Sequence, residues 1–443
     1  MIDRRKFLAG SAAALISAAG AACTGDERSS AAEPVKLPAD LAPDDKEWDA
    51  VRKQFVLADD VIEMSAMLIA SHPKPVRDAI DRHRRGLDER PAEYLHREIG
   101  ENEDRVFSAA AAYLGAEPRA VALTDSTTAG LGLVYNGIDI RAGQEFLTTE
   151  QNYYSTDESI RLKAEKSGAS FRRVPLYDDA ASATAKGLAQ NVLKEVRPAT
   201  RVVALTWVHS STGLKLPIRL IADGIAEMNA DRKEGEQILL AVDGVHGFGV
   251  EDVTMADLGC DYFMAGCHKW LFGPRGTGIV WASERGWRSV SPTIPTFIDG
   301  SVRAAWLHGV EISGEMTGRR LSPGGFKAFE HQWAMADAFG FIMQIGKARV
   351  AARTHELAGR LKKGLTEIDH VTLITPVDAE LSSGIVCFDV EGMSAHRVVD
   401  RLRERRIIAT VTPYAITHAR LTPSIRNTGR EVDTVLDAIR GLA

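Results

Sequence analysis

Two short apolar runs are each followed by side chains that could do chemistry. One run ends at Asp243, with His246 three residues further on, and a second run is followed by His268 and Lys269. Short apolar runs of this kind are typical of strands that are buried on both faces. Because ligands bind beyond the carboxyl ends of parallel strands, we expect these four side chains to meet at one edge of a sheet.

Two more runs bring hydroxyl groups to the same edge. Ser126, Thr127 and Thr128 follow one run and directly precede a helical segment, and Ser210 follows another. The first turn of a helix offers free amide donors and a positive dipole, which suit a phosphate dianion. We therefore predict that the Ser-Thr-Thr turn binds phosphate.

A phosphate site, a buried acid and a lone lysine together indicate pyridoxal phosphate. The aldehyde of this cofactor forms a Schiff base with a primary amine, which only Lys269 supplies here. Its ring nitrogen must stay protonated, and a carboxylate at about 4 Å and an effective dielectric near 20 stabilises that proton by about 4 kcal/mol. Asp243 is suited to this role, since a strand end of this kind is expected to be buried.

Two interpretations from other classes of protein stay open at this stage. Asp243, His209, His246 and His268 could be metal ligands of a hydrolase. The chain could also bind the cofactor without catalysing a reaction. The metal interpretation leaves Lys269 and the hydroxyl turn without a role, so we predict no metal site.

Several segments together resemble the class V aminotransferases, a family of fold-type I pyridoxal phosphate enzymes. The segment AVDGVHGFGVEDVTMADLGCDYFMAGCHKWLFGPRGTGIVW (241–281) is similar to the core signature of this family. LTDSTTAGLGLVYNGI, WVHSSTGLKLPI and ARLTPSIRNTGREVD are similar to its phosphate-binding turn, to a loop beside the cofactor and to its C-terminal tail. The order and spacing of these segments carry the resemblance.

The resemblance implies a role for each matching residue. Lys269 would hold the cofactor and move the substrate proton, Asp243 would pair with the ring nitrogen, and His246 would contact the phenolate oxygen. Arg420 would hold the substrate carboxylate in a bidentate pair. The cofactor phosphate and ring would be contacted by hydroxyl, imidazole and aromatic side chains, namely Ser126, Thr127, Thr128, Ser210, His268 and Tyr153.

Departures from the family pattern reduce the number of candidate reactions. Gln151 stands where many relatives stack a histidine on the ring, so Tyr153 or Tyr154 would stack instead, as in the branch of isopenicillin N epimerase. Cysteine desulfurases need a nucleophilic cysteine shortly before the arginine that binds carboxylate. No cysteine lies between Ile407 and Arg420, which disfavours a desulfurase.

The resemblance leaves three outcomes after the first proton transfer: transamination, epimerisation and loss of a β-substituent. We predict aminotransferase-like chemistry on an amino-acid substrate, with epimerisation as the alternative and a lyase as a further one. The family also implies a homodimer, although Gly324 and Gly325 replace the threonine that some relatives give to the neighbouring subunit's phosphate.

Composition and the order of elements fit this interpretation. The 443 residues are 45% hydrophobic and 26% charged, as in a globular enzyme, and the net charge of −6 does not favour nucleic acid as a partner. Alternating strands and helices predict an α/β three-layer sandwich with a mostly parallel sheet, followed by a smaller α/β domain. The expected segments are a signal (1–30), a tether and arm (31–75), a large domain (76–324) and a small C-terminal domain (325–443).

The N-terminus resembles a twin-arginine export signal. Arg4 and Arg5 precede a short apolar run of small residues, which is too short to span a bilayer. The sequence therefore predicts recognition by the twin-arginine translocation machinery and a periplasmic location. Cys23 at the end of the run leaves lipid anchoring open.

Overall fold

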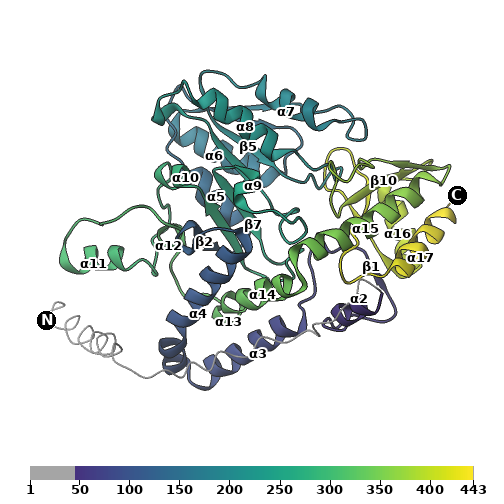
Figure 1. Ribbon diagram of the computed structural model, residues 1–443, viewed down its shortest axis with the longest axis horizontal. Coiled ribbons are helices and arrows are strands. Elements are labelled where there is room, and N and C mark those ends of the chain that lie inside the picture. The colour runs from purple at the N-terminus through teal and green to yellow at the C-terminus, as the bar shows by residue number, and fades with distance from the viewer. Residues whose placement is uncertain (1–44, 443) are drawn as a thin grey trace, which may run out of the picture. The chain divides into compact units, whose positions relative to one another are not determined.

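The strands that lead to the candidate site belong to one seven-stranded sheet (Figure 1). The computed structural model describes residues 45–442. Neighbouring strands are parallel except at β8, which runs opposite to its neighbours β2 and β7. The order across the sheet is β2 (Val121–Thr124), β8 (Gly278–Ala282), β7 (Tyr262–Gly266), β6 (Leu239–Asp243), β5 (Thr200–Thr206), β3 (Glu145–Thr149) and β4 (Ser170–Val174).

Side chains of the sheet alternate between two helical layers. On one face, Tyr262 and Met264 of β7 pack in a core with α5 (Thr127–Gly137) and α6 (Tyr154–Ser167). On the other face, Phe263 contacts Phe248, which in turn packs on Phe339. That ring belongs to α14 (Met335–Ile345), which packs beside α4 (Pro91–Leu114). The predicted α/β fold with a mostly parallel sheet is confirmed. Its central strands are buried at consecutive residues, because helices cover both faces of the sheet.

A second sheet of four antiparallel strands lies in the C-terminal part of the chain. Leu361, Phe388 and Val432 belong to its core. Thr428 and Glu431 form a capping box at the start of α17. The sheet order is β12 (Thr410–Val411), β13 (Ala419–Leu421), β10 (Val386–Val390) and β9 (Val371–Leu373), with the helices α15 (Lys347–Thr366), α16 (Ala395–Glu404) and α17 (Gly429–Arg440).

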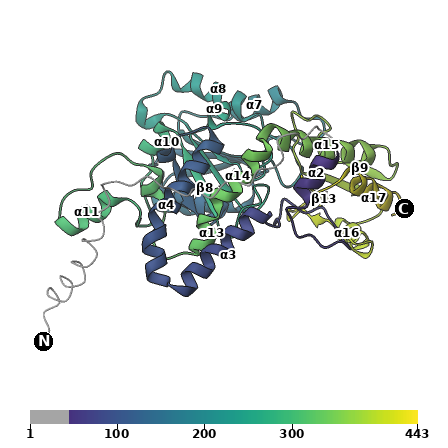
Figure 2. The same ribbon diagram turned by 60° about the horizontal axis from the view of Figure 1, so that its bottom comes forward.

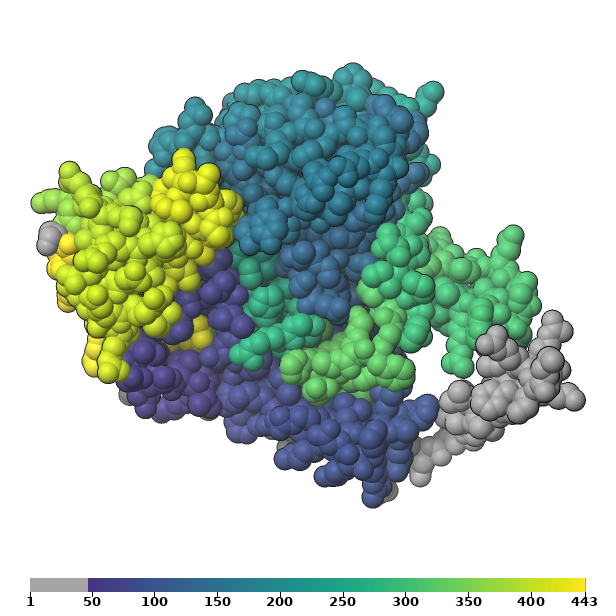
Figure 3. Space-filling model, turned by 180° about the vertical axis from the view of Figure 1, so that it is seen from behind, coloured from purple at the N-terminus to yellow at the C-terminus, as the bar shows by residue number. Residues whose placement is uncertain are grey.

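The segment before the large sheet is bound to the C-terminal part. After α2 (Asp45–Arg52), the strand β1 (Ile62–Glu63) pairs in parallel with β11 (Ile407–Ile408). In the space-filling view, the purple N-terminal segment lies against the yellow C-terminal part (Figure 3). The amide of Ala70 then donates to the carbonyl oxygen of His268 at 3.0 Å, so this arm also supports the loop that carries Lys269.

One helix expected from apolar spacing differs from the structure. The spacing predicts a single amphipathic helix from Phe326 to Phe339, but α13 (Phe329–Trp333) and α14 are separate helices. Phe326 lies before α13 and is 81% exposed, so it does not join the apolar face. Both helices pack near α3 (Lys74–Glu89) and α4 (Figure 2). The domain boundary at residue 325 stays a prediction.

Six more α-helices belong to the described fold, and the export signal lies outside it. Arg4, Arg5 and Cys23 fall outside the described residues, so the signal stays a prediction. Within residues 45–442, no helix has both the length and the apolar composition that crossing a bilayer requires. The remaining α-helices are α7 (Ala185–Leu193), α8 (Ile218–Asn229), α9 (Met255–Leu258), α10 (Glu284–Arg288), α11 (Gly300–His308) and α12 (Gly318–Leu321).

Gly244, directly after Asp243, lies against the ring of Phe263. A Cβ at this position would overlap the ring of Phe263, which is buried in the core. We expect Gly244→Ala to lower the free energy of unfolding of the apoprotein by about 2 kcal/mol, because the ring has no space to move into. Chemical denaturation measures this change.

Gly340→Ala is the matched control for this substitution. Gly340 lies in α14 with open space around its Cα, so alanine should raise stability by about 0.5–1 kcal/mol through helix propensity. Equal stability of the Gly244→Ala protein and the parent would contradict the packing argument.

Candidate active site

Lys269 and Asp243 lie in one buried region at the carboxyl ends of β6 and β7. Burial lowers the pKa of Lys269 to about 8, against the opposing effect of the negative charge of Asp243. Burial raises the pKa of Asp243 to about 6, although the Val245 amide donates to its Oδ1 at 3.2 Å and Lys269 favours its charge. Near neutral pH the carboxylate is therefore charged, and part of the lysine population holds a neutral, nucleophilic amine.

Three buried polar atoms near this pair have no hydrogen-bond partner in the structure. They are Nδ1 of His246, Nδ1 of His268 and Oγ1 of Thr206, whose residue pairs with Asp243 across the strands. Burial lowers the pKa of both imidazoles, and the charge of Lys269 adds to this effect. Buried polar groups without partners are costly, so a polar ligand that bonds to them fits this place.

The hydroxyl turn lies at the start of α5 and is tied to β7. Ser126 caps the helix, since its Oγ accepts a hydrogen bond from the Ala129 amide at 3.1 Å. Oγ1 of Thr127 accepts one from the Gly266 amide at 2.8 Å. Each hydroxyl keeps its own hydrogen for donation to a phosphate oxygen. Thr128 follows in the same turn and is exposed.

Arg420 reaches this region from the second sheet. Its side chain lies on β13 and is 3% exposed. Nη1 donates to the Ser210 carbonyl oxygen at 2.7 Å, and Nε donates to Oγ1 of Thr410 at 2.9 Å. Nη2 has only a long contact of 3.5 Å with the Val411 carbonyl oxygen. One corner of the guanidinium is thus available to a carboxylate.

Of the two adjacent tyrosines, Tyr153 is the one that faces this region. Tyr154 is 69% exposed, whereas Tyr153 is half-buried. Burial raises the pKa of Tyr153, and the positive charge of Arg420 opposes this effect. The turn is held by Asn152, whose Nδ2 donates to the Ala204 carbonyl oxygen at 3.1 Å and whose Oδ1 accepts from the Thr206 amide at 3.0 Å. A ring stacked on a cofactor would therefore come from Tyr153.

Tyr414 is a residue of this region that the sequence did not indicate. Its hydroxyl lies 2.7 Å from Oγ of Ser210, and its ring meets the Tyr153 ring edge-to-face at 6.2 Å between centroids. Burial raises the pKa of Tyr414 to about 12. A tyrosine in a short C-terminal hairpin carries no local signal for a site, because its neighbours here are more than 200 residues away in sequence.

The geometry does not support the alternative metal centre. In the described part of the chain, no three His, Cys, Asp or Glu side chains come close enough together to hold a metal ion. His209 is instead fully buried in the wall of the region, with its Nδ1 2.9 Å from the hydroxyl of Tyr177. Burial lowers the pKa of His209 to about 3.

Similarities to known proteins extend over most of the chain. The chain is 26% identical to the isopenicillin N epimerase of Streptomyces clavuligerus, over 89% of this chain and 98% of that protein. It is also 26% identical to a probable cysteine desulfurase of Xylella fastidiosa, over 80% of this chain and 83% of that protein.

Solved structures share the fold at lower sequence identity. A mutant of C-DES, with glycine covalently linked to its pyridoxal phosphate cofactor, superposes with a TM-score of 0.77 at 20% identity, covering 88% of this chain and 99% of that one. The cysteine desulfurase of Thermococcus onnurineus gives a TM-score of 0.75 at 20% identity, covering 89% and 97%.

The model of one protein family matches most of the described residues. That family is "Aminotransferase class-V", and the match covers residues 70–416, which include Lys269 and Asp243. The unpartnered polar atoms, the hydroxyl turn and the lysine–aspartate pair all fit the cofactor that the family uses. The chain therefore belongs to the class V aminotransferase family and is a pyridoxal phosphate-dependent enzyme.

Proposed function

We propose that the enzyme acts on an amino acid and inverts the configuration of its α-carbon. One observation carries the first part of this proposal: the Lys269 amine and the Arg420 guanidinium lie in the same buried region, where the charge of Arg420 influences the pKa of Lys269. A carboxylate held by Arg420 brings the α-carbon of an amino acid towards that amine. When bound, the cofactor withdraws electrons from this carbon.

The other residues of the region would hold the cofactor. Asp243 would keep the ring nitrogen protonated, because a buried carboxylate strongly favours a positive charge beside it. Tyr153 would cover one face of the ring, and His246 and Ser210 would contact its polar edge. The phosphate would be bound by Ser126, Thr127, Thr128 and His268.

Epimerisation is the outcome that the relatives favour. The similarity to the isopenicillin N epimerases of Streptomyces clavuligerus and Amycolatopsis lactamdurans spans 98% of each of those proteins. Transamination, which the sequence predicts first, is the second candidate. The observation that supports it is the lowered pKa of Lys269, since an amine that is both neutral and charged near pH 8 can take a proton and return it elsewhere.

Sulfur removal by a cysteine nucleophile has little support in this chain. Each of the three described cysteines is buried. Cys387 lies inside β10, where burial raises its pKa to about 12, and Cys267 is raised to about 12 for the same reason. A buried thiol with a raised pKa is a poor nucleophile. This chain therefore resembles the desulfurase relatives in its fold more than in the reactivity of its described cysteines.

We also propose that two copies of the chain form a dimer through the segment 292–326. Trp306 on α11 is 79% exposed, and several other large apolar side chains of this segment are exposed as well. α11 buries only Ala305 in this chain. Exposed apolar surface of this extent is typical of an interface between proteins. The other exposed apolar residues of the segment are Ile294, Phe297, Leu307, Val310, Ile312 and Phe326.

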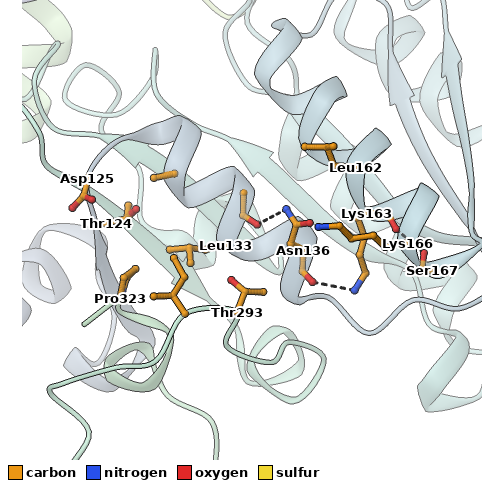
Figure 4. A pocket seen from close by; sticks show the side chains of 13 residues that line it. Thr124, Asp125, Leu133, Asn136, Leu162, Lys163, Lys166, Ser167, Thr293 and Pro323 are labelled. Atoms are coloured by element: carbon orange, nitrogen blue, oxygen red, sulfur yellow. Dashed lines mark hydrogen bonds between the residues drawn. The ribbon is translucent and has the colours of Figure 1, made fainter. Parts of the chain in front are cut away.

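A groove beside this segment could accept part of the second copy. It has a volume of about 700 Å³ and is lined by residues of α5, α6 and the 293–294 loop. In Figure 4, Asn136 and Lys163 form its polar end, where Nζ of Lys163 donates to the Asn136 carbonyl oxygen at 3.0 Å. Asp125, next to the hydroxyl turn, lines the other end. A second copy seated here would lie close to the phosphate turn.

A screen of L- and D-amino acids in deuterated water tests the proposed reaction. We expect the holoenzyme to exchange the α-proton of its substrate for deuterium and to form the opposite enantiomer without keto acid. Nuclear magnetic resonance and chiral chromatography measure both products. Keto acid formed in step with exchange would contradict epimerisation and favour transamination. Lys269→Met should abolish the exchange.

Lys269→Met should stabilise the apoprotein in a pH-dependent manner. The pKa of Lys269 is about 8 in the folded protein and 10.5 in its ordinary environment, so burial of the ammonium costs stability at every pH below 8. We expect the variant to be about 3 kcal/mol more stable than the parent at pH 7, with the difference disappearing as the pH rises from 8 to 10.5. Urea denaturation at a series of pH values measures this difference.

The exposed Lys186 on α7 provides the control for that experiment. Lys186→Met should change stability by less than about 0.5 kcal/mol at any of these pH values, because the side chain lies in solvent. A Lys269→Met protein with the same pH dependence as the parent would show that the amine is not buried.

Trp306→Ser should weaken the dimer. We expect the full chain to elute at twice the 48.1 kDa mass of one copy, and the variant to shift towards the monomer as its concentration falls. Size-exclusion chromatography with light scattering measures this shift. Leu220→Ser, at an exposed apolar position on α8 (Ile218–Asn229), is the control and should leave the mass unchanged. A monomeric parent protein would overturn the dimer proposal.

A further inference from the structure

The hairpin between β12 and β13 carries one side chain towards the active site. Its base is closed by two hydrogen bonds, from the Thr412 amide to the His418 carbonyl oxygen at 3.0 Å and from the His418 amide to Oγ1 of Thr412 at 2.8 Å. Between these residues, Pro413 and the segment 415–417 are exposed. Tyr414 alone is half-buried and has a side-chain partner, Ser210.

Ser210 connects the phenol of Tyr414 to the guanidinium of Arg420. Its Oγ lies 2.7 Å from the Tyr414 hydroxyl, and its carbonyl oxygen accepts a hydrogen bond from Nη1 of Arg420 at 2.7 Å. The phenol thus lies within one residue of the group that would hold the substrate carboxylate. The edge-to-face contact with the Tyr153 ring fixes the plane of the Tyr414 ring.

Tyr414 and Lys269 lie around the same two charged groups. The charges of Asp243 and Arg420 act on the pKa of both Lys269 and Tyr414. The phenol reaches this place from the side of Tyr153, whose ring it meets edge-to-face. A substrate carboxylate held by Arg420 would therefore lie close to both the amine and the phenol.

We propose that Tyr414 is a catalytic residue that exchanges a proton with the α-carbon on the side opposite Lys269. This inference rests on the proposed epimerisation. Inversion needs an acid or base on each side of the carbon, and Lys269 supplies only one of them. The phenol of Tyr414 supplies the second.

The proton transfers balance without an oxidant or reductant. The neutral amine of Lys269 takes the α-proton, and the electron pair of the broken C–H bond stays with the substrate. The hydroxyl of Tyr414 gives its proton to the other side of the α-carbon, where the same electron pair forms the new C–H bond. The resulting ammonium and phenolate return to their starting states by proton exchange with solvent. The reverse reaction uses the phenolate as base and the ammonium as acid.

The surroundings of Tyr414 suit both the donation of a proton by the phenol and its return to the phenolate. Burial raises the pKa of its hydroxyl to about 12, so the group holds its proton at neutral pH and can donate it. Asp243 and Tyr153 raise the pKa further, whereas the Ser210 hydroxyl and the Arg420 charge lower it. The last two groups would therefore stabilise the phenolate that donation leaves behind.

Tyr414→Phe tests this role while it keeps the ring contact with Tyr153. In deuterated water, with the epimerised amino acid, we expect the variant holoenzyme to exchange the α-proton of the enantiomer that Lys269 deprotonates at a rate within about twofold of the parent. Inversion should fall by about 100-fold or more, as for the loss of a general acid. Exchange is measured by nuclear magnetic resonance and inversion by chiral chromatography.

Two further measurements separate a catalytic role from a structural one. The affinity for the amino acid, followed by the change in cofactor absorbance on binding, should stay the same, and so should the melting temperature of the apoprotein. Ile416→Thr, at an exposed position of the same hairpin, is the control and should change neither exchange nor inversion. Should Tyr414→Phe be unstable, Ser210→Ala removes the partner of the phenol and should slow inversion more than exchange.

The outcomes distinguish the inference from the proposed function. Inversion at the parental rate in Tyr414→Phe would overturn the role of Tyr414 and leave epimerisation intact. A parallel loss of exchange, inversion and affinity would also overturn it, since Tyr414 would then only hold the site together. If the parent enzyme exchanges α-protons but inverts no amino acid, the proposed epimerisation fails, and the role of Tyr414 fails with it.

Discussion

The burial of the Lys269 amine beside the Asp243 carboxylate is the constraint on which the site depends. Burial disfavours the charged form of each group, and the opposite charge of the partner residue partly offsets this effect. This balance keeps a carboxylate charged and a lysine partly neutral near the same pH, which chemistry at an amine requires. It holds only while β6 and β7 keep their register, in which Asp243 lies opposite Met264.

The rest of the site is assembled on that pair by segments from distant parts of the chain. The N-terminal arm supports the loop of Lys269 through Ala70, and the C-terminal sheet brings Arg420 to the Ser210 carbonyl oxygen. Because β1 pairs with β11, the arm and the C-terminal part hold each other in place. A site assembled from these segments forms only once the arm and both sheets have folded.

The family fold permits several reactions after the first proton transfer, and the groups around the α-carbon select among them. In this chain the described thiols are buried, whereas the hairpin before Arg420 turns the phenol of Tyr414 inward. A phenol exchanges protons readily and is a weak nucleophile towards sulfur. With Tyr414 in its proposed role, the hairpin therefore favours proton transfer at the α-carbon over the removal of sulfur.

The sequence by itself determined the features that depend on local order. The apolar runs predict the buried strands β2, β5, β6 and β7, and strand ends in a parallel sheet share one edge, so Asp243 and Lys269 could be placed together. Contacts between distant segments have no such local signal. Only the tertiary structure separated Tyr153 from the exposed Tyr154, broke the helix after Phe326 and brought Tyr414 to Ser210. The physical reason is that burial and pairing at these positions depend on neighbours far away in the chain, which residue spacing does not encode.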